Sequence, residues 1–251
     1  MLTQDQITFY QENGYILIPS LITPEEAALY RAEAHAIADR LAQNGKGDAT
    51  WGSAKEVTMG TPTRLLHCHD VQFQSAAFSR LIVDERLTEI AADIIGPNVQ
   101  LHHDKMFIKP PEKGSPFPMH QDVPFFPHDR HSMIAAIIHF DDAPLEKGCL
   151  RVVPGSHKLG VLPHIAEGLF HLPMDEYPIE SATPLPAKAG DAVFFSYLTI
   201  HGSGVNTSSE ARTTLLVQMR DPIDHPTVDT HRSRGQGMML RGIDPSCGLD
   251  K

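Results

Sequence analysis

Residues 190–204 have the sequence GDAVFFSYLTIHGSG, and this stretch indicates the class of fold that the chain adopts. Its apolar run, Ala192–Tyr197, is short and bounded by Gly, Asp and polar residues, which is typical of one buried strand. Four more runs have the same form: Val99–Lys109, Met133–Phe140, Leu150–Val153 and Thr213–Met219. Short strands separated by turns predict an antiparallel sandwich or barrel in the second half of the chain.

The first 96 residues carry helix signals instead. Each predicted helix begins at a Thr or Asp that can cap it, and two of the three end at a glycine. The expected elements are helices over residues 3–14, 23–42 and 84–96, a strand over Tyr15–Ile18 and a loop over Gln43–Met59. Helices followed by short strands predict an α+β fold.

The composition limits the functions that the chain can have. Its 251 residues carry 21 Lys and Arg against 31 Asp and Glu, a formal net charge of −10, and no basic block breaks that balance. We therefore expect neither a nucleic-acid nor a membrane partner. No apolar run is long enough to span a bilayer, and the N-terminus lacks a signal-peptide pattern. Three widely spaced cysteines without a CxxC pair are typical of reduced thiols, so we expect a cytoplasmic protein.

Histidine is frequent, with 15 residues, and such an excess suggests a metal site or acid–base chemistry. Two histidines and one carboxylate form the facial triad that binds Fe(II) and leaves other coordination positions open. In sequence the triad takes the form His-x-Asp plus a distant histidine, because residues i and i+2 of a strand share a face. Three such tripeptides begin at His102, His120 and His139, and their number alone does not choose among them.

The surroundings of the three tripeptides differ. His120 and Asp122 lie between two prolines, as expected near the mouth of a barrel rather than in a central strand. The tripeptide at His139 ends a strand and suits a hydrogen-bonded pair, whereas a salt bridge suits the one at His102. Structural histidines with satisfied hydrogen bonds are the alternative for all three.

Two residues beyond the strand at Ala192–Tyr197 extend this hypothesis. His201 is a candidate for the distant metal ligand because it follows that strand directly. Arg212 begins the next strand, where a buried guanidinium is costly unless it meets a carboxylate. A carboxylate-bearing ligand and a structural ion pair both fit this arginine.

Several runs, in order and over about residues 3–220, resemble the phytanoyl-CoA dioxygenase family. They are FYQENGY (9–15), KPP (109–111), MHQD (119–122), FP (126–127), GCL (148–150), PGSHK (154–158), GDAVFF (190–195), IHGSGVN (200–206) and Arg212. This coverage makes the resemblance far more specific than a single tripeptide.

The resemblance implies a double-stranded β-helix, the cupin-type jelly roll, with N-terminal helices outside it. It implies a single domain over residues 1–251, with a helical part to about 96, a jelly-roll core at about 97–220 and a covering segment at 221–251. The implied activity is that of an Fe(II)- and 2-oxoglutarate-dependent dioxygenase (EC 1.14.11.-) that uses O2. Such an enzyme hydroxylates an unactivated C–H bond of a small or medium organic substrate and converts 2-oxoglutarate to succinate and CO2.

The family motif also implies roles for individual residues. His120, Asp122 and His201 match its metal ligands and catalytic centre. Arg212 matches the arginine that pairs with the far carboxylate of 2-oxoglutarate, and Ser203 matches the hydroxyl beside it. Because Asp122 is present, a halogenase, which gives up this carboxylate, is disfavoured.

Other positions of the co-substrate pocket are also assigned by resemblance. Met106 matches an apolar wall of the pocket. Some members have a lysine upstream of Phe73 that reaches the co-substrate; here we expect His67 in its place, with Arg64 also nearby and a simple loop histidine as the alternative. Ile138 is expected where some members carry a tryptophan, which makes that wall smaller.

Two other functions are compatible with the same fold. A cupin-fold binding protein with an idle metal site and a zinc hydrolase that uses the same triad are both possible, but neither needs Arg212. The loop at 160–186 and the segment at 231–241, which carries several arginines, are candidates for a lid that selects the substrate. A solvated basic loop is the alternative for the latter.

Overall fold

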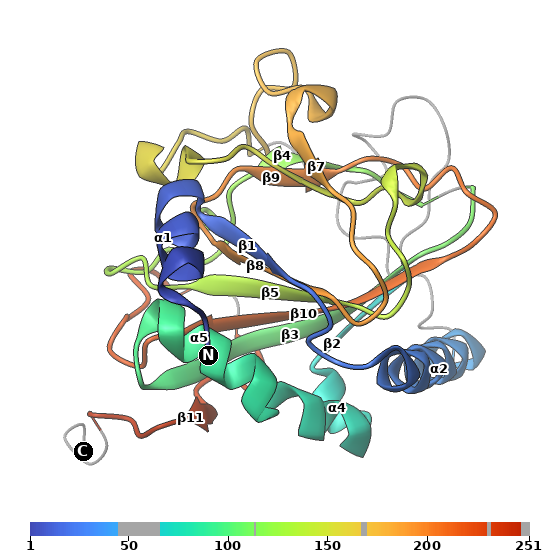
Figure 1. Cartoon of the computed structure of the whole chain (residues 1–251), viewed down its shortest axis with the longest axis horizontal. Coiled ribbons are helices and arrows are strands. Elements are labelled where there is room, and N and C mark those ends of the chain that lie inside the picture. Colours follow the sequence, from blue (N-terminus) through green and yellow to red (C-terminus); the bar gives the residue numbers. More distant parts are fainter. Residues whose placement is uncertain (45–65, 113, 167–169, 230–231, 247–251) are drawn as a thin grey trace.

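The computed structural model describes residues 1–44, 66–112, 114–166, 170–229 and 232–246. Two antiparallel sheets face each other, and the space between them holds the candidate site (Figure 1). The larger sheet contains, in spatial order, β1 (Tyr15–Ile18), β8 (Ala192–Ser196), β5 (Ile134–His139), β10 (Arg212–Arg220), β3 (Val99–Lys109) and β11 (Met239–Arg241), and β2 (Leu66–His69) also pairs with β3. The smaller sheet contains β4 (Phe117–His120), β9 (His201–Ser203), β6 (Leu150–Val152) and β7 (Thr183–Leu185).

The helices lie outside the sheets (Figure 1). They are α1 (Gln4–Asn13), α2 (Pro24–Gln43), α4 (Ala76–Ile82) and α5 (Glu85–Ile95), with short 3-10 turns at Val71–Phe73, Leu145–Lys147, Ser156–Leu159 and Ile179–Ser181. The capping boxes predicted for α1 and α2 are both present, at Thr3 with Gln6 and at Thr23 with Glu26. None of the helices in the described ranges is both long enough and apolar enough to cross a membrane.

The predicted α+β architecture and its main elements are confirmed. The strand at Tyr15–Ile18, the three predicted helices and the five other predicted strands occur where the sequence places them, within one residue at each end. The sequence does not predict α4 or the short strands β2, β4, β7 and β11, and it places His201 after a strand rather than in β9. The N-terminal part is also less separate than expected, because β1 and β2 both join the larger sheet. The loop expected at 43–59 falls largely outside the described residues.

The two faces of the larger sheet have different neighbours. Its outer face packs on the helices in an apolar core to which all four central strands contribute, with Val217 and Phe194 among the fully buried members. Its inner face looks toward the smaller sheet, and β10 carries polar groups there at every second position near its ends. The outer face therefore supplies burial of apolar area, while the inner face is available for a site.

A glycine between two candidate site residues tests this arrangement. A Cβ on Gly202 in β9 would lie 2.6 Å from the carbonyl oxygen of Phe117 in the paired strand β4. We expect Gly202→Ala to push the two strands apart and to lower the free energy of unfolding by about 1–3 kcal/mol, measured by urea denaturation. Gly204→Ala is the matched control, since a Cβ there meets nothing within 4 Å. Equal stability of the two variants would contradict this packing.

Candidate metal and co-substrate site

Three side chains converge between the sheets from two different strands. His120 ends β4, Asp122 follows it, and His201 begins β9. Their ligand atoms lie within 4.8 Å of one another, and all three residues are buried. The Nε2 atoms of His120 and His201 are 3.6 and 3.7 Å from the same Asp122 oxygen, Oδ1. The structure thus brings together the three residues that the sequence analysis combined as a triad.

Hydrogen bonds aim these three groups at a common point. The Nδ1 atoms of His120 and His201 are 2.7 Å and 2.9 Å from the carbonyl oxygens of Pro118 and Thr199. A carbonyl can only accept, so each Nδ1 carries the proton and each Nε2 presents a lone pair. Gln218 donates to Oδ2 of Asp122 at 2.6 Å, which leaves Oδ1 for a ligand.

The charges of the triad fit a bound cation. Burial lowers the pKa of His201 to about 4, so its imidazole is neutral at pH 7. Burial alone would raise the pKa of Asp122, but the neighbouring histidines and the Gln218 hydrogen bond hold it below its usual value. Two imidazole nitrogens and one buried carboxylate are the donor set of a divalent transition metal with open positions.

A cavity of about 90 Å³ extends from the triad between the sheets. Its walls are mostly apolar, with Phe107, Phe117, Leu150 and Phe195 among them. Its polar lining includes Ser203, Arg212, Thr214 and His139. An apolar cavity with a few convergent polar groups is the usual form of a small-molecule site.

Two buried basic side chains lie side by side on neighbouring strands, and one of them, Arg212, lines this cavity. Arg212 in β10 pairs in register with Lys109 in β3, so both side chains lie on the same face of the sheet. Lys109 is fully buried and Arg212 is 7% exposed. Neither makes an ion pair within the described ranges, and Arg212 Nε has no hydrogen-bond partner there. Burial lowers the pKa of Arg212 to about 10, so it stays charged at pH 7. Like charges in this position repel, and a bound carboxylate would relieve the repulsion.

Lys109 belongs to the KPP motif, but the sequence alone predicts no role for it. Its Nζ donates to Ser203 Oγ at 2.7 Å and to the Gly204 carbonyl oxygen at 2.7 Å. Burial, and then the charge of Arg212, hold its pKa well below the ordinary lysine value. A lysine followed by two prolines resembles an exposed strand end, and only the register with Arg212 shows that it is buried.

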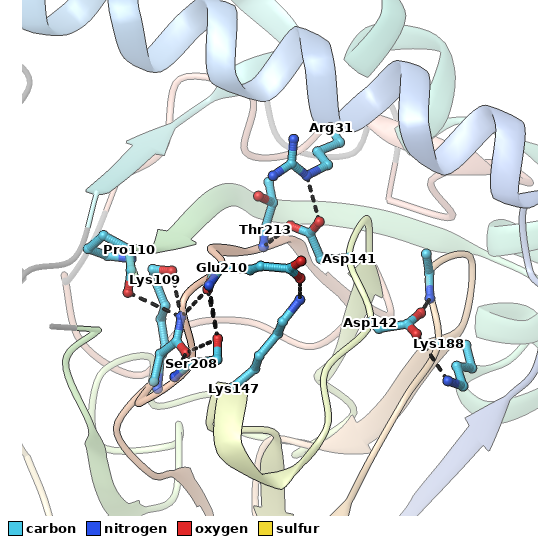
Figure 2. A network of polar contacts seen from close by, with 12 residues as sticks. Arg31, Lys109, Pro110, Asp141, Asp142, Lys147, Lys188, Ser208, Glu210 and Thr213 are labelled. Atoms are coloured by element: carbon cyan, nitrogen blue, oxygen red, sulfur yellow. Dashed lines mark hydrogen bonds and ion pairs between the residues drawn. The ribbon is translucent and has the colours of Figure 1, made fainter. Parts of the chain in front are cut away.

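A network of polar contacts fixes the start of β10, which carries Arg212 (Figure 2). Asp141 accepts hydrogen bonds from Arg31 Nε at 2.5 Å and from the backbone of Thr213 at 2.8 Å. The side chain of Asn206 bonds the carbonyl oxygens of Lys109, Pro110 and Glu210, which ties β3 to the loop before β10. Arg212 itself donates from Nη1 to the carbonyl oxygen of Gly148. The guanidinium is therefore held in place before any ligand arrives.

The other two His-x-Asp tripeptides do not form the internal pairs that were predicted from the sequence. His139 does not pair with Asp141: among the described residues both of its ring nitrogens are buried without a partner, and it lines the cavity. His102 bonds His103 and Asp104 accepts from the Val71 backbone, with no ion pair between His102 and Asp104 in the described structure. Neither tripeptide belongs to the candidate metal group.

Three further expectations require correction. Met106 and Ile138 face the helices and belong to the outer core, so neither forms a wall of the cavity. The neighbouring residues Phe107 and Ile137 line it instead, because adjacent strand residues point to opposite faces. His67 packs beside Phe107, with ring centroids 6.5 Å apart, but does not itself line the cavity. Arg64 lies outside the described residues.

Comparison with known proteins connects this geometry to a family. The sequence model described as Phytanoyl-CoA dioxygenase (PhyH) matches residues 10–214. The peroxisomal phytanoyl-CoA dioxygenase of Mus musculus is 31% identical over 229 residues, covering 84% of this chain and 66% of that protein. The ectoine dioxygenase of Stutzerimonas stutzeri (strain A1501) is 28% identical over 226 residues, covering 82% of this chain and 72% of that protein. The chain thus spans just under two thirds of the length of the mouse relative.

Solved structures share the fold. The epimerase SnoN, in complex with Fe3+, alpha ketoglutarate and nogalamycin RO, has a TM-score of 0.74 at 24% identity, covering 95% of this chain and 98% of that one. EctD from S. alaskensis with bound Fe has a TM-score of 0.73 at 21% identity, covering 96% and 86%. The likeness extends over nearly the whole chain and supports the jelly-roll architecture predicted from the sequence.

Gln218 tests how the candidate metal site is oriented. We expect Gln218→Met to weaken Mn(II) binding by about 10- to 100-fold, because Asp122 loses the bond that holds its carboxylate. Isothermal titration calorimetry of the metal-free chain measures this. Gln72→Met, at another buried glutamine, is the control and should bind as the wild type does. Unchanged affinity in Gln218→Met would remove Gln218 from the site.

The buried histidines predict a pH dependence of stability in the metal-free chain. Burial lowers the pKa of His201 to about 4 and that of His139 to about 3, below the value of about 6.5 in the unfolded chain. The unfolded state therefore binds more protons below pH 6.5, and the free energy of unfolding falls as the pH drops from 6.5 toward these values. Between pH 7.5 and 5.0 each histidine contributes a loss of up to about 2 kcal/mol.

Urea denaturation at the two pH values measures this loss. The variant His139→Leu isolates the contribution of one histidine and should lose less stability on acidification than the wild type. An equal loss in both proteins would show that His139 titrates normally.

Proposed function

The chain belongs to the phytanoyl-CoA dioxygenase family, and we propose that it is an Fe(II)- and 2-oxoglutarate-dependent dioxygenase that hydroxylates a small organic substrate. One observation carries the proposal: the cavity beside the triad is lined by the buried Arg212, which lies in register with the buried Lys109, and neither side chain has a carboxylate partner among the described residues. A zinc hydrolase or an idle binding protein has no need of such a pair. A dicarboxylate co-substrate needs such a pair, because these side chains hold one of its two carboxylates.

Under this proposal His120, Asp122 and His201 hold the metal through two Nε2 atoms and Oδ1. Bound Fe(II) supplies the activation of O2, coupled to oxidation of 2-oxoglutarate to succinate and CO2. The chain contributes orientation: the two Nδ1–H bonds fix the imidazole tautomers, and Gln218 fixes the carboxylate. These contacts exist without a ligand, so little reorganisation accompanies binding.

The far carboxylate of 2-oxoglutarate is assigned to Arg212, Ser203 and Lys109. Because Lys109 donates to Ser203 Oγ, the hydroxyl proton of Ser203 is free to turn toward the cavity and donate to the carboxylate. Arg212 has an unused Nε–H, and both nitrogens of His139 lack partners nearby. A carboxylate at this end would satisfy polar atoms that are otherwise buried alone.

The apolar walls exclude water from the reacting groups. Phe107, Phe117 and Phe195 line the cavity between the carboxylate end and the triad. Exclusion of water strengthens the charge interactions of Arg212 and protects reactive species from side reactions. The buried free thiols Cys68 and Cys149 support a reducing, cytoplasmic location for this chemistry.

Substitution of Lys109 tests the co-substrate assignment. We expect Lys109→Met to weaken 2-oxoglutarate binding to the Mn(II)-loaded chain by about 10-fold or more, because a buried cation and the orientation of Ser203 are both lost. Mn(II) affinity should not change.

Calorimetric titration with 2-oxoglutarate and urea denaturation make these measurements. Lys147→Met is the control, since Lys147 pairs with the exposed Glu210 away from the cavity (Figure 2). If Lys109→Met loses stability and keeps its affinity for 2-oxoglutarate, Lys109 has only a structural role.

A further inference from the structure

Strand β10 carries a second buried arginine beyond the metal ligands. Arg212, Gln218 and Arg220 are separated by even numbers of residues, and β10 pairs regularly with β5 from Thr214 to Met219. The three side chains therefore lie on one face of the strand, at about 3.3 Å per residue. Gln218 contacts the metal ligand Asp122, so Arg212 and Arg220 lie on opposite sides of the triad along the strand.

A cavity of about 750 Å³ opens at Arg220. It lies between the barrel and the C-terminal segment, and we call it the tail cavity; its lining includes His102, His128, Arg220, Arg232 and Gln236. The segment is not a free loop. Ser233 donates to the Asp70 carboxylate, the Arg234 guanidinium lies 4.2 Å from the ring centroid of Phe73, and β11 pairs with β3. The wall of the cavity is therefore packed on the fold.

The charge of Arg220 is not matched by an ion pair. It is 8% exposed, and its hydrogen bonds all run from Nη1 to the backbone carbonyls of Asp221, Pro222 and Asp224, while Nε has no partner in the described ranges. No carboxylate there lies within 4.0 Å of it. Burial lowers the pKa of Arg220, and the charges of Asp224, Asp244, Asp221 and Asp129 act on it in the opposite direction from beyond ion-pair distance. The Asp224 carboxylate already accepts from the backbone of Arg130 and from Ser132.

The other charged side chains among the described residues that line the tail cavity form an ion pair with each other. Arg232 pairs with Asp229 at 2.8 Å, and both are exposed at the rim. His128 uses Nδ1 on the Phe126 carbonyl oxygen, so its buried Nε2, which has no partner, is an acceptor when the ring is neutral. Burial lowers the pKa of His128 and favours that neutral form. Arg220 is thus the buried cation among the described residues that line the cavity.

Aromatic side chains connect the tail cavity to the triad. The register between β3 and β10 skips His102, and this bulge brings the rings of His102 and His103 to 5.0 Å from each other and to 4.9 Å from Phe126. Phe126 is 5.9 Å from Phe125, which is 6.1 Å from the metal ligand His120. Two apolar rings therefore separate the cavity from the metal ligands.

We propose that the tail cavity binds the anionic group of the prime substrate through Arg220, while the apolar part of the substrate passes Phe126 and Phe125 toward the metal. The substrate class is then an organic anion, a carboxylate or a phosphate ester. This inference rests on the proposed function for the direction in which the substrate extends, but the anion site itself does not depend on turnover. Co-substrate and substrate would each be anchored by a buried arginine of the same strand.

The test uses the full chain loaded with Mn(II) and saturated with 2-oxoglutarate, so that the co-substrate cavity is filled. Calorimetric titration with methyl phosphate and, separately, with acetate shows which anion binds. We expect one of them to bind and Arg220→Gln to weaken that binding about 10-fold or more. Gln236→Glu, which adds a negative charge to the cavity lining without altering Arg220, should weaken it as well and covers the case in which Arg220→Gln does not fold.

Arg232→Gln is the control, and its affinity should stay within about twofold of the wild type because its charge is already paired at the rim. Equal affinity in Arg220→Gln and wild type would overturn the proposal, as would the absence of binding by either anion at about 20 mM. Binding that 2-oxoglutarate abolishes would place the anion in the co-substrate cavity and would also overturn it. Failure of 2-oxoglutarate itself to bind would count against the proposed function, and the Arg220→Gln comparison would still test the tail cavity.

Discussion

The alternation of side chains along β10 is the constraint on which the site depends. On one face, Leu215, Val217 and Met219 are fully buried in the core against the helices. On the other face, Arg212 lies at the co-substrate end and Gln218 holds the metal ligand Asp122. Because the apolar face is fixed by burial, the register cannot slip without moving every functional side chain to the wrong side. The same packing that stabilises the sheet therefore positions the chemistry.

Among the described residues, the buried polar groups on the inner face of the barrel are less completely paired than those on the outer face. Lys109 and Arg212 place like charges across paired strands, and His139 keeps two buried nitrogens without partners. Such groups destabilise a ligand-free protein, and the apolar core on the outer face offsets that cost. A bound dicarboxylate would pair with these basic side chains and accept a hydrogen bond from His139. The pattern is that of a site organised for a ligand before the ligand arrives.

Much of this could be predicted from the sequence, and the failures have physical causes. Helix caps and buried strands are local signals, so α1, α2, α5 and the longer strands were placed well. The strands β2, β4, β7, β9 and β11 have three or four residues, too few to show a period. The equally short β1 and β6 lie in mostly apolar runs bounded by Gly and Pro, which is why the sequence predicts them. His120 and Asp122 could be chosen among three equivalent tripeptides only through a family resemblance.

Other failures come from register and from distance along the chain. Met106 and Ile138 were each one residue away from the true lining residues, and a shift of one residue in a strand reverses the face. The role of Lys109 depends on its partner Arg212, about a hundred residues later, and a single sequence does not reveal that register.

The central claim is that the triad and the buried cations form one site that binds Fe(II) together with 2-oxoglutarate. Anaerobic titration of the metal-free chain with Fe(II) and 2-oxoglutarate, followed by visible absorption, tests it most directly. The account predicts a weak metal-to-ligand charge-transfer band that requires both components and is absent in His201→Ala. Binding of Fe(II) without this band would contradict the account and would leave a metal site with no co-substrate function.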